Sequence, residues 1–373
     1  MTQAPPRRKQ SVSLTPKVIF GLLKETFKEW QEDKASRLAA ALAYYTTFSL
    51  APLLIIAIAI ASLVFGQEAA QGTIDDQLRG LIGSEGATAI QDMIKNSQKP
   101  AEGTIATIIS FVLLFFGASG VFAELQDSLN TIWEVAPKPD AGVKNILRSR
   151  FLSFTMVLVI GFLLLVSLVL SAGLAALGNY FGNLVPNLAI LWQTLNFLIS
   201  FGVITVLFAM IYRILPDAKI AWGDVWIGAA ITSLLFSIGK WLIGLYLGNS
   251  SVGSTYGAAG SFVVLLLWVN YSAQILFFGA EFTQVYANKF GSQIVPDKNA
   301  VFVTKETRAQ QGIPHKQDLN DAVAESDNAS NNIQQRENKR KSPHPAAVAL
   351  SAIVGAYRGV TQMGKGKGKK KNR

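Results

Sequence analysis

Long hydrophobic runs alternate with short polar stretches through the first 286 residues of the chain. A helix needs about 20 apolar residues to cross the roughly 30 Å hydrocarbon core of a bilayer, and six of these runs are long enough. The pattern therefore predicts an all-α fold, that of a polytopic membrane protein with six transmembrane helices. The predicted spans cover residues 38–65, 104–122, 151–177, 190–211, 221–247 and 258–286.

Two further stretches carry hydrophobic residues at helical spacing but are too polar to span. Residues 16–30 place a hydrophobic set on one side of a helix and Lys17, Lys24 and Lys28 on the other. That set is Val18, Ile19, Leu22, Leu23, Phe27 and Trp30. We predict an amphipathic interfacial helix here, just ahead of the first span. The same spacing in residues 74–98 predicts two short amphipathic helices lying on the outer face.

Charge is scarce and unevenly distributed along the chain. Only 16% of the 373 residues are charged, against about a quarter in soluble domains, and the net charge is +10. Of the 34 Lys and Arg residues, 30 fall in segments on one side of the predicted spans and three on the other. Because cytoplasmic loops carry the positive excess, we predict that both termini are cytoplasmic.

The polar segments divide the chain into three parts. Residues 1–37 form a cytoplasmic N-terminal arm with the amphipathic helix, and residues 38–286 form the membrane domain. Residues 287–373 are predicted to be a basic, largely disordered cytoplasmic tail. The lysines of Lys365–Arg373 could bind anionic lipid, although a solvated basic tail explains them equally well. Membrane lipids are therefore the expected partners, and homo-oligomerisation stays open.

Recognisable catalytic motifs are missing from the sequence. It has no cysteine, and both histidines, His315 and His344, lie in the polar C-terminal part, so the clustered ligands of a zinc hydrolase are absent. Asp75, Asp76 and Glu85 are explained by a solvated helix start. We predict no catalytic residue, cofactor or metal site, and the sequence favours a function that is not enzymatic. Nucleic-acid binding is disfavoured, since no aromatic residues interleave the lysines of the tail.

Polar residues inside the predicted spans are the candidates for function, because polar groups in a bilayer are costly and normally face the bundle or a wet cavity. Several fall on one stripe of their helix, and Pro52 adds a break in the helical hydrogen bonding of the first span. Stripes of small and polar residues also serve helix packing alone, and that alternative stays open. The candidates for binding or transport are Glu124, Asp127, Arg213, Lys240, Asn270, Gln274, Glu281, Tyr45 and Ser49.

The depth of each charged candidate follows from the direction of its span. Glu124 and Glu281 come late in spans that run inward, so both should lie near the cytoplasmic end, where Arg213 also falls. Lys240 comes late in a span that runs outward and should lie nearer the outer side. We therefore expect Arg213, rather than Lys240, to neutralise one or both acids.

Four segments together resemble one known family. They are LAAALAYYTTFSLAPLL, FGASGVFAELQDSLNTIWEV, YRILPDAKIAWGDVWIGAAITSLLFSIGKWLIGLYL and YGAAGSFVVLLLWVNYSAQILFFGAEFTQVY. In this order they are similar to the YihY/BrkB family of bacterial inner-membrane proteins, often labelled ribonuclease BN or virulence factor BrkB. The resemblance covers roughly residues 15–290. It implies a six-helix protein of the bacterial inner membrane whose function is unsettled, and it carries over no catalytic residue.

These observations predict a transporter-like function, the handling of a small solute, ion or lipid across or within the membrane. Intramembrane carboxylates with amide neighbours suit coupling to a cation or a proton. Two alternatives stay open: a membrane-associated ribonuclease, which the family label suggests and the missing metal ligands disfavour, and a membrane scaffold that acts through its basic tail.

Overall fold

The computed structural model describes residues 15–97, 104–138, 155, 189–249 and 260–341. These residues are mostly helical, and they divide into two units, with a boundary after Ile313. The helices of the first unit are α1 (Pro16–Glu32), α2 (Ala35–Phe65), α3 (Gln67–Ser97), α4 (Thr104–Ile132), α6 (Ala189–Ile214), α7 (Trp222–Asn249), α9 (Gly260–Lys289) and α10 (Lys305–Gln310). The second unit contains α11 (Lys316–Lys341).

Four of the described helices are long and apolar enough to cross a membrane. Their hydrophobic windows are Ala35–Ala59, Phe197–Ile214, Trp222–Ile243 and Phe262–Lys289. These windows match the predicted first, fourth, fifth and sixth spans and confirm an all-α membrane architecture. The predicted second span lies in α4, which continues ten residues beyond it. Apart from Thr155, the predicted third span lies outside the described residues, so the number six stays a prediction.

The first three helices are joined by abrupt turns. Lys34 adopts a left-handed backbone conformation, with φ of 53°, between α1 and α2. Gly66 separates α2 from α3 with φ of 82°, a region that glycine enters without steric cost.

Helix α3 differs from the two short surface helices that the sequence predicted. It is one continuous helix, and it packs along α2 and α9. Its residues Ile90 and Ile94 are buried in a cluster with Ile58 of α2 and with Leu265 and Val269 of α9. The predicted break is therefore wrong, because burial against two neighbouring helices stabilises the glycine-containing middle of α3.

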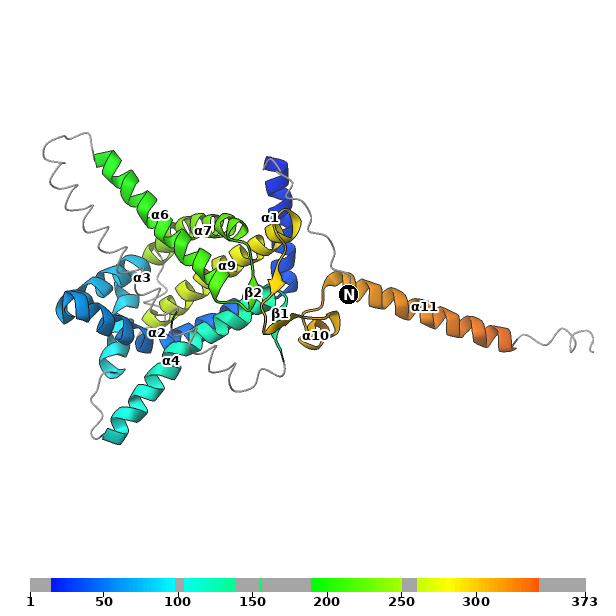
Figure 1. Cartoon of the computed structure of the whole chain (residues 1–373), viewed down its shortest axis with the longest axis horizontal. Helices are drawn as coiled ribbons and strands as arrows, with labels where there is room; N and C mark the ends of the chain where they lie inside the picture. Colours follow the sequence, from blue (N-terminus) through cyan, green and yellow to red (C-terminus); the bar gives the residue numbers. More distant parts are fainter. Residues whose placement is uncertain (1–14, 98–103, 139–154, 156–188, 250–259, 342–373) are drawn as a thin grey trace, which may run out of the picture. The chain divides into compact units, whose positions relative to one another are not determined.

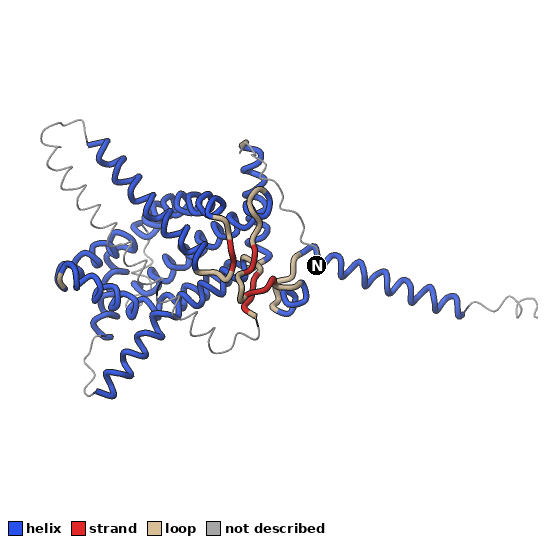
Figure 2. Tube along the Cα trace, in the orientation of Figure 1, coloured by secondary structure: helices blue, strands red, loops and turns tan. Residues whose placement is uncertain are grey.

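Two small antiparallel strand pairs close one end of the helix bundle (Figures 1 and 2). β1 (Val135–Pro137) pairs with β4 (Ala300–Phe302), and β2 (Ala218–Lys219) pairs with β3 (Val295–Pro296). We call this end of the bundle, with α1, α10 and the strands, the base.

The strand pairs change the predicted limits of the tail. Residues 295–313 do not form a disordered segment, because main-chain pairing fixes them against residues 134–138 and 217–219. Within the second unit, residues 316–341 form a helix that is exposed along its described part. The segment Lys365–Arg373 lies outside the described residues.

The largest buried side chains gather where α4, α6, α7 and α9 meet. Tyr212 stacks on Phe208 and meets the ring of Trp133 edge-on, with ring centroids 6.2 and 6.4 Å apart. Its hydroxyl donates to the carbonyl oxygen of Leu276 at 2.7 Å, which ties α6 to α9. The base is therefore attached to a densely packed part of the bundle.

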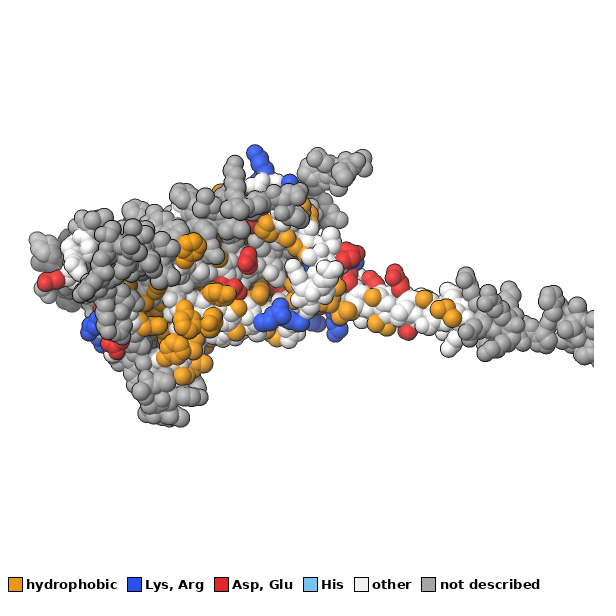
Figure 3. Space-filling view, turned by 90° about the horizontal axis from the view of Figure 1, so that it is seen from below, with side chains coloured by type: hydrophobic (Ala, Val, Ile, Leu, Met, Phe, Trp, Pro, Cys, Tyr) orange, Lys and Arg blue, Asp and Glu red, His pale blue; other side chains and the backbone are white. Residues whose placement is uncertain are grey.

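Hydrophobic side chains also form patches on the described part of the bundle surface (Figure 3). Exposed examples are Phe20, Phe48, Phe197, Leu234 and Trp241, each at least 50% accessible. So many exposed large apolar side chains are expected on a protein that is surrounded by lipid rather than by water.

Candidate functional site

A buried ion pair lies at the centre of the base. The Arg308 guanidinium contacts the Asp33 carboxylate at 2.5 Å, and both side chains are 3% exposed. Asp33 follows the last residue of α1, and its own N–H group bonds the last turn of that helix. Arg308 lies in α10, whose first turn is capped by the hydroxyl of Thr304. The pair joins segments 275 residues apart in sequence.

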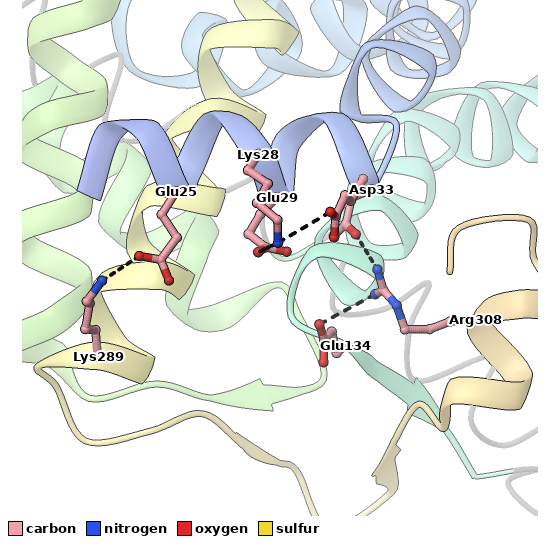
Figure 4. Close-up of polar contacts among 8 residues, drawn as sticks. Glu25, Lys28, Glu29, Asp33, Glu134, Lys289 and Arg308 are labelled. Atoms are coloured by element: carbon pink, nitrogen blue, oxygen red, sulfur yellow. Dashed lines mark hydrogen bonds and ion pairs between the residues drawn. The ribbon is translucent and has the colours of Figure 1, made fainter. Parts of the chain in front are cut away.

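Glu134 adds a second carboxylate to Arg308. Its Oε1 lies 3.7 Å from Nη1 of the guanidinium (Figure 4). Glu134 directly follows the last turn of α4 and has a positive φ of 54°. The N–H group of Val303 donates to its carbonyl oxygen at 2.9 Å, so pairing of β1 with β4 fixes Glu134 near α10.

Glu281 of α9 is the most deeply buried carboxylate of the described residues. It has no exposed surface, and neither of its oxygens accepts a hydrogen bond. The charged groups that act on it electrostatically are Asp33, Glu29, Arg308 and Glu134. Ion pairs join the Arg308 guanidinium to the carboxylates of Asp33 and Glu134, whereas Glu281 makes no ion pair with it and is linked to these groups only electrostatically. We call Asp33, Glu134, Glu281 and Arg308 the basal cluster.

A second set of charges lies along α1, next to the basal cluster (Figure 4). Lys28 contacts Glu29 at 3.3 Å and Glu32 at 3.4 Å. Partial burial lowers the pKa of Lys28, but the two carboxylates outweigh this and raise it above its usual value. Glu25 pairs with Lys289 at 2.6 Å, an exposed contact that joins α1 to the end of α9.

The hydroxyl stripe of the first span serves helix packing. A Cβ atom added to Gly120 of α4 would lie 3.3 Å from the Ser49 hydroxyl and 3.9 Å from the Tyr45 ring. The same addition to Gly117 would lie 3.2 Å from the ring of Pro52. Small residues on α4 thus let α2 approach closely, as in membrane helix pairs. Tyr45 and Ser49 do not reach the basal cluster.

The other charged candidates lie on three helices, with Glu124 and Asp127 one turn apart on α4. Arg213 lies over the ring of Trp222, 5.9 Å from its centroid, and makes no ion pair with Glu124 or Glu281 in the described structure. Glu124 is half-buried, Asp127 is exposed, and both lie on α4. Lys240 is exposed on α7. The expected neutralisation by Arg213 is therefore not found, because its guanidinium packs on an aromatic ring of the neighbouring helix instead.

Asn270 and Gln274 do share a face of α9. The Gln274 amide donates to the Asn270 side-chain oxygen at 3.1 Å. Gln274 and Tyr271 are the polar residues lining a cavity of about 360 Å³ between α1, α7 and α9. The remaining lining is hydrophobic: Phe27, Trp30, Leu235, Ile238, Gly239, Leu242, Ile275 and Phe278.

Sequence reasoning missed most of the polar contacts at the base. Asn130 donates to Asp217 Oδ2 at 2.9 Å and accepts from the Asp217 N–H group at 2.8 Å, a reciprocal contact between α4 and the α6–β2 connection. Arg308 was missed because it lies in the segment predicted to be disordered. Asp33 lies five residues before the predicted first span and Glu134 twelve residues after the predicted second span, and only polar residues inside or close to the spans were considered. The end of α4, ten residues beyond the predicted span, is what brings Glu134 to the bundle.

The basal cluster is a buried set of opposite charges. Arg308 compensates the carboxylates of Asp33 and Glu134 through ion pairs, and Glu281 lies buried without a hydrogen-bond partner. A buried ionisable group of this kind inside an apolar helix is the feature that most suggests a function.

Comparisons with known proteins identify relatives that are named as membrane proteins. A sequence model described as virulence factor BrkB matches residues 26–303. Two UPF0761 membrane proteins of Stenotrophomonas maltophilia, from strains R551-3 and K279a, are 29% identical over 255 residues, which is 64% of this chain and 54% of each relative. One from Psychromonas ingrahamii is 28% identical over 276 residues, 72% of this chain and 88% of its own length.

The chain thus spans about half the length of the Stenotrophomonas relatives it matches. No solved structure matches it. Of the basal cluster, Asp33, Glu134 and Glu281 lie within the matched residues 26–303, and Arg308 lies beyond them.

Proposed function

Because the chain belongs to the virulence factor BrkB family and carries a fully buried carboxylate in an apolar helix, we propose that it moves a small cation or a proton across the membrane. The observation that carries this proposal is Glu281, which has no exposed surface and no hydrogen-bond partner. Ionisable groups at such positions are expensive and typically mark ion pathways or proton relays. Keeping an ionisable side chain buried costs free energy, and a role of Glu281 in moving a cation or a proton best explains why it lies there.

The membrane placement is part of the proposal. We infer six spans in the bacterial inner membrane, with both termini and the base on the cytoplasmic side. The distribution of Lys and Arg supports this orientation, with 30 of 34 in the segments assigned to the inside. In this orientation the basal cluster lies at the inner end of the pathway.

Ion flux through reconstituted vesicles tests the function. Purified protein in liposomes is given an imposed gradient of protons, Na⁺ or K⁺, and flux is followed with ion-sensitive dyes. We expect flux above that of empty liposomes, and at least a tenfold loss in Glu281→Gln, which keeps the shape and removes the charge. Glu25→Gln is the matched control, because Glu25 is exposed and pairs with Lys289 away from the basal cluster. Wild-type protein that carries none of these ions would contradict the proposal.

Lipid handling is a second candidate, favoured by the cavity between α1, α7 and α9. Its lining is almost wholly apolar and could hold an acyl chain. A fluorescent-lipid scrambling assay tests it with two neighbouring substitutions. Leu235→Trp fills the cavity and should slow scrambling, while Leu234→Trp changes an exposed residue outside the cavity and should not. Equal rates in the two variants would remove this candidate.

A further inference from the structure

We propose that the cavity between α1, α7 and α9 binds one acyl chain of an anionic phospholipid from the inner leaflet, and that lysines on the exposed flank of α1 hold its headgroup. The inference rests on the membrane placement proposed above, and it develops the lipid candidate by naming the lipid and its leaflet. It concerns binding, which can be measured without ion flux and without scrambling.

The first support is the shape and lining of the cavity. The lining extends over residues 235–242 of α7 and 271–278 of α9, roughly 10 Å at 1.5 Å per residue. The volume of about 360 Å³ lies within the roughly 300–1,000 Å³ that is typical of ligand pockets. Two lining residues, Ile238 and Leu242, are 49% and 50% exposed, so the cavity opens onto the apolar surface of α7 and α9. Lipid surrounds such a surface, and an acyl chain can therefore enter from the bilayer.

The second support is the position of α1 across one end of the cavity. Phe27 and Trp30 of α1 are part of the lining. Leu22 of α1 packs with Phe282 of α9, one turn beyond the last lining residue of α9, Phe278. Because α9 ends at the base, the cavity extends from α1 toward the middle of the bundle. In the proposed orientation, this is the direction from the inner headgroup region into the hydrocarbon.

The third support is a line of lysines on α1. Lys17, Lys24 and Lys28 are seven and four residues apart, which places them on one side of a helix with 3.6 residues per turn. Phe20 and Phe27, also seven residues apart, lie beside that line, and all five side chains are exposed. Aromatic residues at the hydrocarbon boundary with lysines at the level of the phosphates are typical of helices that bind anionic membranes.

Two of these lysines are available to an anion. Lys17 and Lys24 make no ion pair with any described residue, whereas Lys28 contacts two carboxylates of its own helix. Lys24 lies one turn before Phe27, and a lysine side chain is long enough to extend along the helix surface toward a phosphate. Charge complementarity therefore favours an anionic headgroup over a zwitterionic one.

Two other occupants of the cavity give different results in one experiment. A helix from a second copy of the chain would produce a dimer. Lipid that only coats the apolar surface would bind with equal affinity whatever its headgroup. An anionic lipid held by α1 would instead bind to the monomer and depend on the lysines.

Native mass spectrometry of the full chain in detergent measures lipid binding and oligomeric state together. The protein is titrated with phosphatidylglycerol, and separately with phosphatidylcholine that carries the same acyl chains. We expect one phosphatidylglycerol to bind at least about fivefold more tightly than phosphatidylcholine, which is the gain from one lysine near an anionic membrane surface.

Matched variants locate the site. Lys24→Gln should weaken phosphatidylglycerol binding about fivefold and leave phosphatidylcholine unchanged, whereas Lys24→Arg should bind as the wild type does. Lys298→Gln removes an exposed lysine between β3 and β4 and should change neither affinity. Leu235→Trp fills the cavity and should abolish the tight binding, while Leu234→Trp, outside the cavity, should not. The lysines of residues 365–373 are present in every variant, so they cannot cause these differences.

Three results would overturn the inference. They are equal affinity of the wild type for the two lipids, the same change in Lys24→Gln as in Lys298→Gln, and a lipid-free dimer that Leu235→Trp dissociates. Lys24 is exposed, so its variants decide the question even if Leu235→Trp does not fold. Lipid binding without ion flux or scrambling would leave this inference standing and contradict the proposed transport functions, so they can fail separately.

Discussion

The guanidinium of Arg308 contacts the carboxylate of Asp33 at 2.5 Å, and each side chain is 3% exposed. This contact attaches the last helix of the first unit to the corner between its first two helices. In a buried pair, each partner depends on the other, because a lone charge in a poorly hydrated interior is costly. The Asp33–Arg308 pair therefore contributes to holding α10 against the helix bundle.

Neutralising Asp33 should destabilise the protein. In Asp33→Asn, Arg308 retains only the longer contact to Glu134 at 3.7 Å, and we expect a loss of about 3 kcal/mol in the free energy of unfolding. Chemical unfolding in mild detergent measures it. Glu25→Gln breaks the exposed pair with Lys289, in which both side chains are more than 40% accessible, and should cost at most about 1 kcal/mol. Equal losses in the two variants would show that burial does not strengthen the Asp33 contact.

Close packing of α7 on α9 predicts a strong effect at Gly279. A Cβ atom there would collide with the Thr232 hydroxyl and lie 2.7 Å from the Tyr212 hydroxyl. Both hydroxyls already make hydrogen bonds of 2.7 Å to backbone carbonyls, so neither can move freely. We expect Gly279→Ala to destabilise by about 1–3 kcal/mol.

Gly202 of α6 provides the matched control for Gly279. No atom outside its own helix lies within 4 Å of a Cβ atom added there. Gly202→Ala should therefore leave stability unchanged or raise it by about 0.5–1 kcal/mol, since alanine lowers the entropy of the unfolded chain. Melting temperatures of the two variants should shift in opposite directions, and a shift of the same sign and size would refute the packing argument.

The reciprocal contact between Asn130 and Asp217 predicts a specific failure on charge substitution. Asn130→Asp replaces the amide donor by a carboxylate 2.9 Å from Asp217 Oδ2, so a hydrogen bond becomes a repulsion. We expect a loss of about 2–3 kcal/mol at neutral pH, measured by chemical unfolding. Asn288→Asp makes the same chemical change at an exposed position of α9 and should shift stability by under about 0.5 kcal/mol. A small effect at both positions would argue against the contact.

The flanks of α1 predict where this helix lies in the bilayer. Leu22 is buried against α9, while Ile19 is 41% exposed on one flank of α1 and Lys24 is exposed on a different flank. The chain has no cysteine, so single spin labels can be placed at Ile19→Cys and Lys24→Cys. We expect the label at position 19 to be accessible to oxygen and the label at position 24 to a water-soluble nickel complex. The same accessibility at both positions would remove α1 from the interface.

The candidate site was predictable only in part. Glu281 was found because a carboxylate in an apolar run stands out in the sequence. Its neighbours were not found, because Asp33, Glu134 and Arg308 are ordinary charged residues in polar segments. The expected partner, Arg213, was chosen by depth along the spans, and depth does not determine the direction in which a side chain points. Its guanidinium packs on Trp222 instead.

The break predicted in α3 and the disorder predicted for residues 295–313 are wrong for a related reason. Both rested on the polarity and glycine content of short windows. In the structure, Ile90 and Ile94 are buried against α2 and α9, and residues 300–302 pair with residues 135–137. Such contacts between distant segments outweigh weak local preferences.

By itself, the sequence determined that this is an α-helical membrane protein, where its main apolar helices lie, and that Glu281 is an exceptional residue. These features follow from the length and composition of local runs, because transfer of apolar groups from water and main-chain hydrogen bonding act within each segment. The tertiary structure alone decided that Arg308 meets Asp33, that Ser49 packs on Gly120, and that the base closes one end of the bundle. Those contacts depend on how helices rotate and approach one another, which no single segment encodes.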